Sequence, residues 1–242
     1  MLGVGVPEAL AAAAAAGITR VVTVGCDQAS SKWSATCAAA NPAVYAAVAI
    51  HPNEVPDPSP EPLRIVEELA GQARVVAVGE TGLDYYWDSR PHEVQQWWFR
   101  QHIAIAKRTG KALMIHDRDA HADVLRILAE EGAPEHVIFH CFSGDVEMAK
   151  VCAEAGYVMS FAGVVTFSNA RSLREAALVA PPELILAETD APYLTPVPNR
   201  GKPNSPAMTA YTIRFLAELK GIDLAEFCDI ISANAQRVFG WD

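Results

Sequence analysis

The chain has 242 residues, 51% of them hydrophobic, and a net charge of −10 with a pI near 5.1. This length suits one large buried core, so we expect a single domain over residues 1–242. The acidic balance argues against broad, non-specific binding of nucleic acid, although bound metal ions can make a site locally positive. The alanine-rich run at 9–16 is too short to cross a membrane.

The five cysteines are widely spaced and include no C-x-x-C pair. An odd number without such a pair argues against a disulfide framework and against a zinc knuckle. The sequence therefore predicts reduced thiols and a cytoplasmic protein. We expect no membrane association and no obligate protein partner.

Short apolar runs alternate with helical patterns along the whole chain. The predicted strands lie near residues 20–25, 44–50, 74–80, 112–116, 136–140, 156–161 and 184–190. The predicted helices lie near 7–16, around Trp33 and Cys37, and near 63–70, 92–109, 120–131, 146–155, 173–178, 207–219 and 224–239. This alternation predicts an α/β fold with a parallel sheet. Seven strands after an opening helix fit a (β/α)8 TIM-barrel type of fold whose first strand is missing.

The stretch at 74–85 combines a buried strand pattern with a carboxylate. Its first half is apolar and β-branched, which is typical of a strand covered on both faces. Glycines then stand on both sides of Glu80. In α/β enzymes such a strand end places a ligand or a base, whereas a helix-capping role for Glu80 is the alternative.

Five of the seven predicted strands end in a histidine or a carboxylate. These residues are His51, Glu80, His116, His140 and Asp190. In a barrel the carboxyl ends of the strands converge on one pocket, so we expect a shared metal or acid–base site. Imidazoles mixed with carboxylates suit Zn²⁺, Mn²⁺ or Fe²⁺ better than Ca²⁺.

Four segments carry a family resemblance. They are Gly79–Tyr85 (GETGLDY), Ile115–Ala120 (IHDRDA), His140–Gly144 (HCFSG) and Glu188–Leu194 (ETDAPYL). In this order they resemble the signatures of the TatD family of metal-dependent deoxyribonucleases, and Ile50–Pro52 and Pro198–Pro206 are similar to that family as well. The resemblance extends from about Pro7 to Phe239.

The resemblance implies a role for each residue of the strand ends. Glu80 bridges two divalent ions, which are Mg²⁺, Mn²⁺ or Zn²⁺, and His116 and His140 bind one of them. Asp190 binds the other ion and orients or deprotonates the attacking water. His51 lies near the scissile phosphate.

Substrate contacts are expected from residues that follow the strands. Arg118 is a candidate for holding a non-bridging phosphate oxygen, because guanidinium suits phosphate. Arg200 and Lys202 lie in a loop after the last strand, where barrels often bind phosphate. Tyr85 and the two aromatic residues after it are candidates for stacking on a base. Ordinary surface charges and loop packing are the alternatives.

The sequence departs from the family at its start. Family members begin with a strand that carries a His-x-His pair, and no such pair occurs in this chain. One metal site keeps Glu80, His116 and His140 as its ligands. The other metal site keeps only Asp190 and a share of Glu80. We expect the natural protein to begin further upstream, with a true short form as the alternative, and we expect weak two-metal hydrolysis from this chain.

The leading functional hypothesis is a metal-dependent hydrolase that cleaves DNA phosphodiesters, exonucleolytically on single strands or ends. A small phosphodiester is the other candidate substrate. An amidohydrolase or lactonase with the same barrel is one alternative. A catalytically impaired barrel that acts as a binding scaffold is another.

Overall fold

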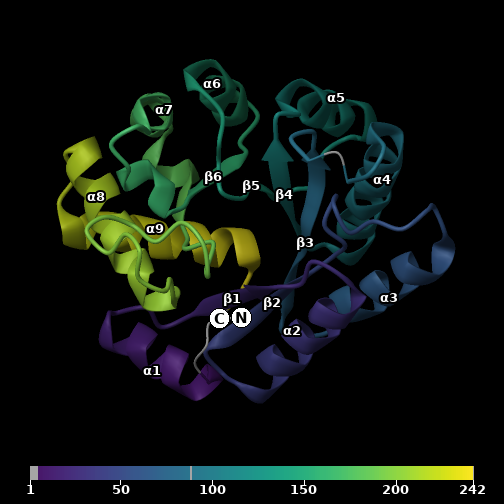
Figure 1. The fold of residues 1–242 in the computed structure, drawn as a ribbon, viewed down its shortest axis with the longest axis horizontal. Coiled ribbons are helices and arrows are strands. Elements are labelled where there is room, and N and C mark those ends of the chain that lie inside the picture. The colour runs from purple at the N-terminus through teal and green to yellow at the C-terminus, as the bar shows by residue number, and fades with distance from the viewer. Residues whose placement is uncertain (1–4, 88, 242) are drawn as a thin grey trace. The chain divides into compact units, whose positions relative to one another are not determined.

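The computed structural model describes residues 5–87 and 89–241 (Figure 1). They form two compact units. The first unit holds the chain up to Val21 together with Cys141–Arg237, and the second unit holds Val22–His140 together with the residues from Val238 onward. That residues 1–242 form a single domain remains a prediction. Within the described ranges, no helix has both the length and the apolar character needed to cross a lipid bilayer.

The second unit contains a parallel sheet. Its strands are β1 (Val21–Val24, in this unit from Val22), β2 (Val44–Val48), β3 (Val75–Asp84), β4 (Ala112–Arg118) and β5 (Val137–Phe139), adjacent in chain order. Its helices are α2 (Gln28–Ala40), α3 (Pro60–Ala70), α4 (His92–Thr109) and α5 (His121–Glu131). Each helix connects two neighbouring strands, as parallel pairing of consecutive strands requires.

The core of the second unit lies between the sheet and its helices. Every residue of β2 and β3 is buried. The helices α2, α3 and α4 pack against these two strands (Figure 1). Trp98, Phe99 and Ile103 on α4 are fully buried. Strands covered in this way need apolar side chains on both faces, which explains their uninterrupted hydrophobic runs.

The first unit combines two strands with several helices. Its first elements along the chain are α1 (Val6–Ala15), α6 (Val146–Glu154), β6 (Val158–Phe161), the 3-10 turn η1 (Gly163–Thr166) and α7 (Arg171–Val179). They are followed by the 3-10 turn η2 (Pro182–Leu184), β7 (Ile185–Ala187), the 3-10 turn η3 (Pro206–Met208), α8 (Thr209–Lys220) and most of α9 (Leu224–Phe239). Strands β6 and β7 pair in parallel. Helix α1 packs against η3, far away in the sequence.

The structure confirms the α/β class and the seven predicted strands, all of which lie within the described residues. The largest differences from the predicted strand ends occur at β3 and β7. Strand β3 continues to Asp84, where it pairs with Arg118 of β4, instead of ending at Glu80. Strand β7 ends at Ala187, so Asp190 lies in the following loop with a positive φ of 52°.

Candidate metal centre

Strand β3 brings Glu80 close to β4 because glycines stand on either side of it. A Cβ atom on Gly79 would lie 2.6 Å from Cβ of Met114, and one on Gly82 would lie 2.1 Å from the carbonyl oxygen of His116. Gly82 also has a φ of +137°. Glycine is the residue that permits both the close approach and this backbone conformation. The two strands therefore lie close enough for His116 to reach Glu80.

Three imidazoles surround one oxygen of Glu80. Nδ1 of His116 lies 2.7 Å from Glu80 Oε1. Nε2 of His140 lies 3.5 Å from the same oxygen, and Nε2 of His51 lies 3.6 Å from it. His116 belongs to β4, while His51 and His140 follow the carboxyl ends of β2 and β5. Four residues that the sequence predicts for the site thus lie together at one end of the second unit's sheet.

This group of side chains fits a divalent metal ion. One ligand atom from each of His51, Glu80 and His116 lies within 4.8 Å of the other two. Imidazole nitrogen with carboxylate oxygen is the donor set that Zn²⁺, Mn²⁺ and Fe²⁺ accept. Two histidines and one carboxylate are typical of catalytic zinc sites that keep an open position. The assignment of individual ligands stays a prediction.

The electrostatics of the centre also suit a cation. For His51, burial is the largest influence and lowers its pKa to about 4, so the ring is neutral at pH 7. For His116, burial disfavours the protonated ring, but hydrogen bonds to Asp84 and Glu80 outweigh the effect of burial and raise the pKa of His116 to about 9. For Glu80, burial favours the neutral acid, yet His140 and His116 hold its pKa well below the usual range. A proton and a metal ion therefore compete for the nitrogen of His116.

Asp84 is a site residue that the sequence analysis missed. It is 1% exposed, and its Oδ2 lies 2.9 Å from Nε2 of His116. The buried side chain of Gln95 fixes the Asp84 backbone, accepting from its N–H and donating to its carbonyl. A signal was present, because Glu80, Gly82 and Asp84 are spaced by two and so share one face of an extended strand.

Asn53 is a second missed residue. Its side-chain Nδ2 donates to Asp84 Oδ2 at 3.1 Å, and its backbone N–H donates to His51 Nδ1 at 3.2 Å. No sequence pattern marks Asn53, because it lies in a turn after β2 and its importance arises only from tertiary contacts.

Three predicted residues belong to the first unit. Asp190 follows β7 in the loop described above. The Arg200 guanidinium lies 3.8 Å from the centre of the Phe167 ring, and Lys202 Nζ donates to Asn199 Oδ1 at 3.1 Å. The roles of Asp190, Arg200 and Lys202 in catalysis and substrate binding stay predictions.

Tyr85 has several contacts within the second unit. Its ring stacks on His92 with centroids 3.6 Å apart, and its hydroxyl donates to Asp123 Oδ2 at 2.7 Å. Burial is the main cause that raises the pKa of Tyr85 to about 12. Its role in substrate binding stays a prediction.

Arg118 lies against the two aromatic residues that follow Tyr85. Its guanidinium carbon is 3.8 Å from the centre of the Tyr86 ring and 5.7 Å from that of Trp87. The two rings meet edge to face at 4.9 Å, and they are 55% and 54% exposed. We call Arg118, Tyr86 and Trp87 the aromatic surface.

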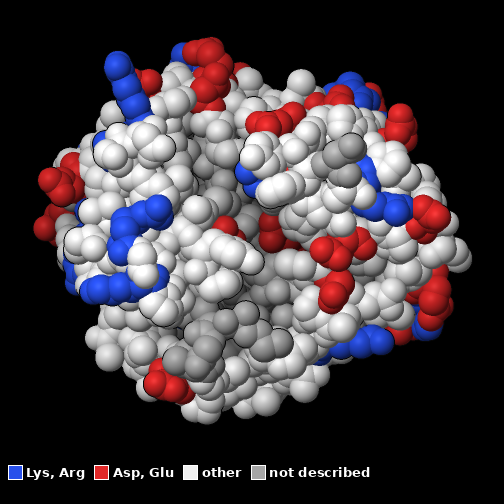
Figure 2. Space-filling view, in the orientation of Figure 1, with Lys and Arg blue, Asp and Glu red and all other residues white. Residues whose placement is uncertain are grey.

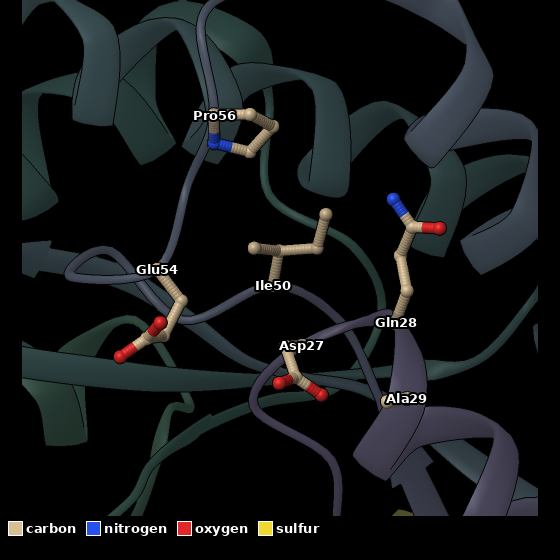
Figure 3. Close-up of a pocket in the computed structure, with 6 residues that line it drawn as sticks. All are labelled: Asp27, Gln28, Ala29, Ile50, Glu54 and Pro56. Atoms are coloured by element: carbon tan, nitrogen blue, oxygen red, sulfur yellow. The ribbon is translucent and has the colours of Figure 1, made fainter.

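A hollow of about 330 Å³ lies beside the loop after β2 (Figure 3). Figure 3 shows Ile50 between Glu54 and Gln28. Asp27 also lines the hollow, and it caps α2 by accepting from the backbone of Ser30 at 2.7 Å. Both charged side chains that line the hollow are acidic, so they repel phosphate. The guanidinium of Arg118 is therefore a better partner for a phosphate group than the hollow is.

Comparison with known proteins places these observations in a family. The family model of the TatD related DNases matches residues 5–240. An uncharacterized metal-dependent hydrolase TatD from Mycobacterium tuberculosis is 50% identical over 234 residues, covering 94% of this chain and 88% of that protein. The uncharacterized metal-dependent hydrolase YabD from Bacillus subtilis is 41% identical, covering 96% of this chain and 91% of that protein.

Solved structures agree with this placement. The crystal structure of YJJV, a TatD homologue from Escherichia coli, matches with a TM-score of 0.92 and 27% identity, covering 98% of this chain and 92% of that chain. A TatD family hydrolase from Entamoeba histolytica, 18% identical with a TM-score of 0.83, covers 96% of this chain and 88% of that chain and shares the fold. The fold is thus of the TIM-barrel type with seven strands described. Because the family model spans nearly the whole chain and the relatives share this fold, the chain belongs to the TatD family of metal-dependent hydrolases.

Proposed function

We propose that this chain is a divalent-metal-dependent deoxyribonuclease that removes nucleotides from single strands or free ends of DNA. The observation that carries the proposal is the approach of three imidazoles to Oε1 of Glu80. The family description, TatD related DNase, supports the choice of DNA. We further propose that the protein acts in the cytoplasm, because its five cysteines are odd in number, widely spaced and include no C-x-x-C pair.

Each residue of the centre has a proposed task. Glu80, His116 and His140 hold the metal ion, which when bound supplies Lewis acidity toward a phosphoryl oxygen and a water molecule. His51 accepts the Asn53 N–H at Nδ1, so its neutral ring carries the hydrogen on Nε2. That N–H is a donor for a phosphate oxygen. For Asp190, which belongs to the first unit, the family resemblance supports the proposed task of orienting or deprotonating the attacking water.

The aromatic surface supports a nucleic-acid substrate. Arg118 brings a positive charge to two half-exposed rings, and bases stack on such rings with little regard to sequence. The turn that carries both rings is bound to Asp84, which also contacts His116. A base on this surface would therefore belong to a strand whose phosphate reaches the metal centre.

The surface charge favours short substrates and ends. On the face shown in Figure 2, basic side chains occur in small separate groups among acidic ones. A long duplex is held by many phosphate contacts at once. A chain of net charge −10 with scattered cations favours contact with only a few phosphates.

The test is hydrolysis by the purified protein with Mg²⁺, Mn²⁺ or Zn²⁺. Single-stranded and double-stranded DNA, RNA, bis(p-nitrophenyl) phosphate, a lactone and a carboxylic ester are compared as substrates. We expect stepwise shortening of end-labelled DNA and loss of this activity in Glu80→Gln. Glu67→Gln, on the exposed side of α3, is the matched control and keeps the activity. Hydrolysis of the lactone without hydrolysis of any phosphodiester would refute the proposal.

A further inference from the structure

The two carboxylate oxygens of Asp84 have different partners. Oδ1 accepts the backbone N–H groups of Tyr86 at 3.1 Å and Trp87 at 3.2 Å, which fixes the turn after β3. Oδ2 faces Nε2 of His116 and also accepts from Asn53. One oxygen therefore stabilises the backbone, while the other contacts an imidazole of the metal centre.

The His116 ring lies between two carboxylates. Nδ1 faces Glu80 at 2.7 Å and Nε2 faces Asp84 at 2.9 Å. When a metal ion takes one nitrogen, the ring keeps its single hydrogen on the other. A carboxylate at Nε2 can only accept, so it holds the hydrogen there and leaves the Nδ1 lone pair beside Glu80.

We propose that Asp84 is a positioning residue that sets the tautomer of His116 for metal binding through Nδ1. The inference rests on the proposed function, in which His116 is a metal ligand. Asp84 touches neither the ion nor the substrate in this arrangement. It acts through His116, and the buried position of Asp84 keeps water from replacing its hydrogen bond.

Asn53 extends this arrangement to the second imidazole. Its side chain donates to Asp84 Oδ2, and its backbone N–H donates to Nδ1 of His51. The hydrogen of neutral His51 is thereby kept on Nε2, the nitrogen that faces Glu80. When a metal ion is bound at Nδ1 of His116, the two histidines are thus held in opposite tautomers, so that His116 offers a lone pair and His51 offers a hydrogen.

Asp84→Asn separates the two tasks of Asp84. Oδ1 of the new amide still accepts the backbone N–H groups of Tyr86 and Trp87. The amide nitrogen, however, donates toward Nε2 of His116 and drives the ring hydrogen onto Nδ1, and it no longer accepts from the Asn53 side chain. We expect metal affinity to fall about 10- to 100-fold, as for other residues that orient metal ligands. Asp27→Asn removes the same charge at an exposed helix cap that asparagine also satisfies, and it is the matched control.

Metal affinity is measured by competition with a chromophoric chelator, using Zn²⁺ and Mn²⁺ alone. Long-range ¹H–¹⁵N spectra of the Zn²⁺-loaded protein report which nitrogen of His116 carries the hydrogen. We expect Nε2–H in the wild type and in Asp27→Asn, and weakened binding with an altered His116 signal in Asp84→Asn. Asn53→Ala, a milder change, lowers the affinity in the same direction and keeps the inference testable if Asp84→Asn does not fold.

The outcomes separate the inference from the proposed function. If the wild type binds metal through His116 and both variants bind it equally well, the positioning role of Asp84 is wrong while the metal centre stands. If the wild type carries the hydrogen on Nδ1, the inference is also wrong. If the wild type binds no divalent ion, the proposed function fails and the inference fails with it.

Discussion

Thr81 and His102 form a hydrogen bond inside the second unit, with Oγ1 and Nδ1 2.7 Å apart. Thr81 follows Glu80 on β3, and His102 lies on α4, where it is fully buried. The contact ties the helix to the strand that carries the metal centre. Nε2 of His102 has no hydrogen-bond partner among the described residues, so the protonated ring would place an unpaired charge in the core.

The buried His102 predicts a loss of stability in acid. Burial lowers the pKa of His102 from 6.5 to about 3. The imidazole is therefore protonated below pH 6.5 in the unfolded chain, but only below about pH 3 in the folded protein. Stability from this group is complete above pH 6.5 and declines as the pH falls from 6.5 to 3. At pH 5 the loss is about 2 kcal/mol. Urea unfolding of the metal-free protein at pH 7 and pH 5 should show this difference, and His102→Gln should make it smaller.

The glycine at position 82 predicts a steric requirement at the metal centre. Gly82→Ala places a methyl group against the His116 carbonyl and imposes an unfavourable φ, so we expect a loss of about 3 kcal/mol or more and weaker metal binding. Gly110→Ala is the control, since Gly110 also has a positive φ but no atom within 4 Å of the added carbon. It should cost about 1 kcal/mol. Equal losses of unfolding free energy in the two variants would contradict the steric argument.

The aromatic surface predicts a difference between substrates. Trp87→Ala should lower kcat/KM for single-stranded DNA about 5- to 150-fold, because stacking of one base contributes about 1–3 kcal/mol. Hydrolysis of bis(p-nitrophenyl) phosphate, which has no base to stack, should change little. Trp33→Ala is a matched control, since Trp33 on α2 is 55% exposed, and it should leave both activities intact. A parallel decrease on both substrates would place Trp87 in the support of the metal centre instead.

Lys220 predicts a local stabilisation of the first unit. At the end of α8, its Nζ donates to the carbonyl oxygens of Ala177, Leu178 and Ala180 at 2.9, 3.1 and 2.7 Å. Lys220→Met leaves these groups at the end of α7 without their cation, so we expect a loss of about 2 kcal/mol in urea unfolding. Lys150→Met, which removes an exposed ion pair, should change stability by less than about 1 kcal/mol.

Sequence patterns predicted the parts of the centre that lie at the carboxyl side of apolar runs. His51, Glu80, His116 and His140 all follow apolar runs, and parallel strands bring such positions to one edge of a sheet. The order of strands and helices was predictable for the same reason, because buried parallel strands require continuous hydrophobic runs. Local periodicity is sufficient for these features.

The rest of the centre depends on contacts that no local pattern reveals. The glycines around Glu80 suggested a break, yet in a central strand they permit close packing, and β3 continues through Gly82 to Asp84. Asn53 lies in a turn and contacts Asp84, which is 31 residues away. Hydrogen bonds of this kind become visible only when the backbone has been built in three dimensions.

The packing of α1 against η3 has a consequence for synthesis on the ribosome. Helix α1 emerges before its partner segment, which is translated roughly 190 residues later, an interval of about 10 to 40 seconds at bacterial and eukaryotic elongation rates. During that time, the stretch 22–140 already contains nearly all of the second unit. The alanine-rich helix α1 therefore stays without its packing partner in the nascent chain, while the second unit, which carries Glu80, can already fold.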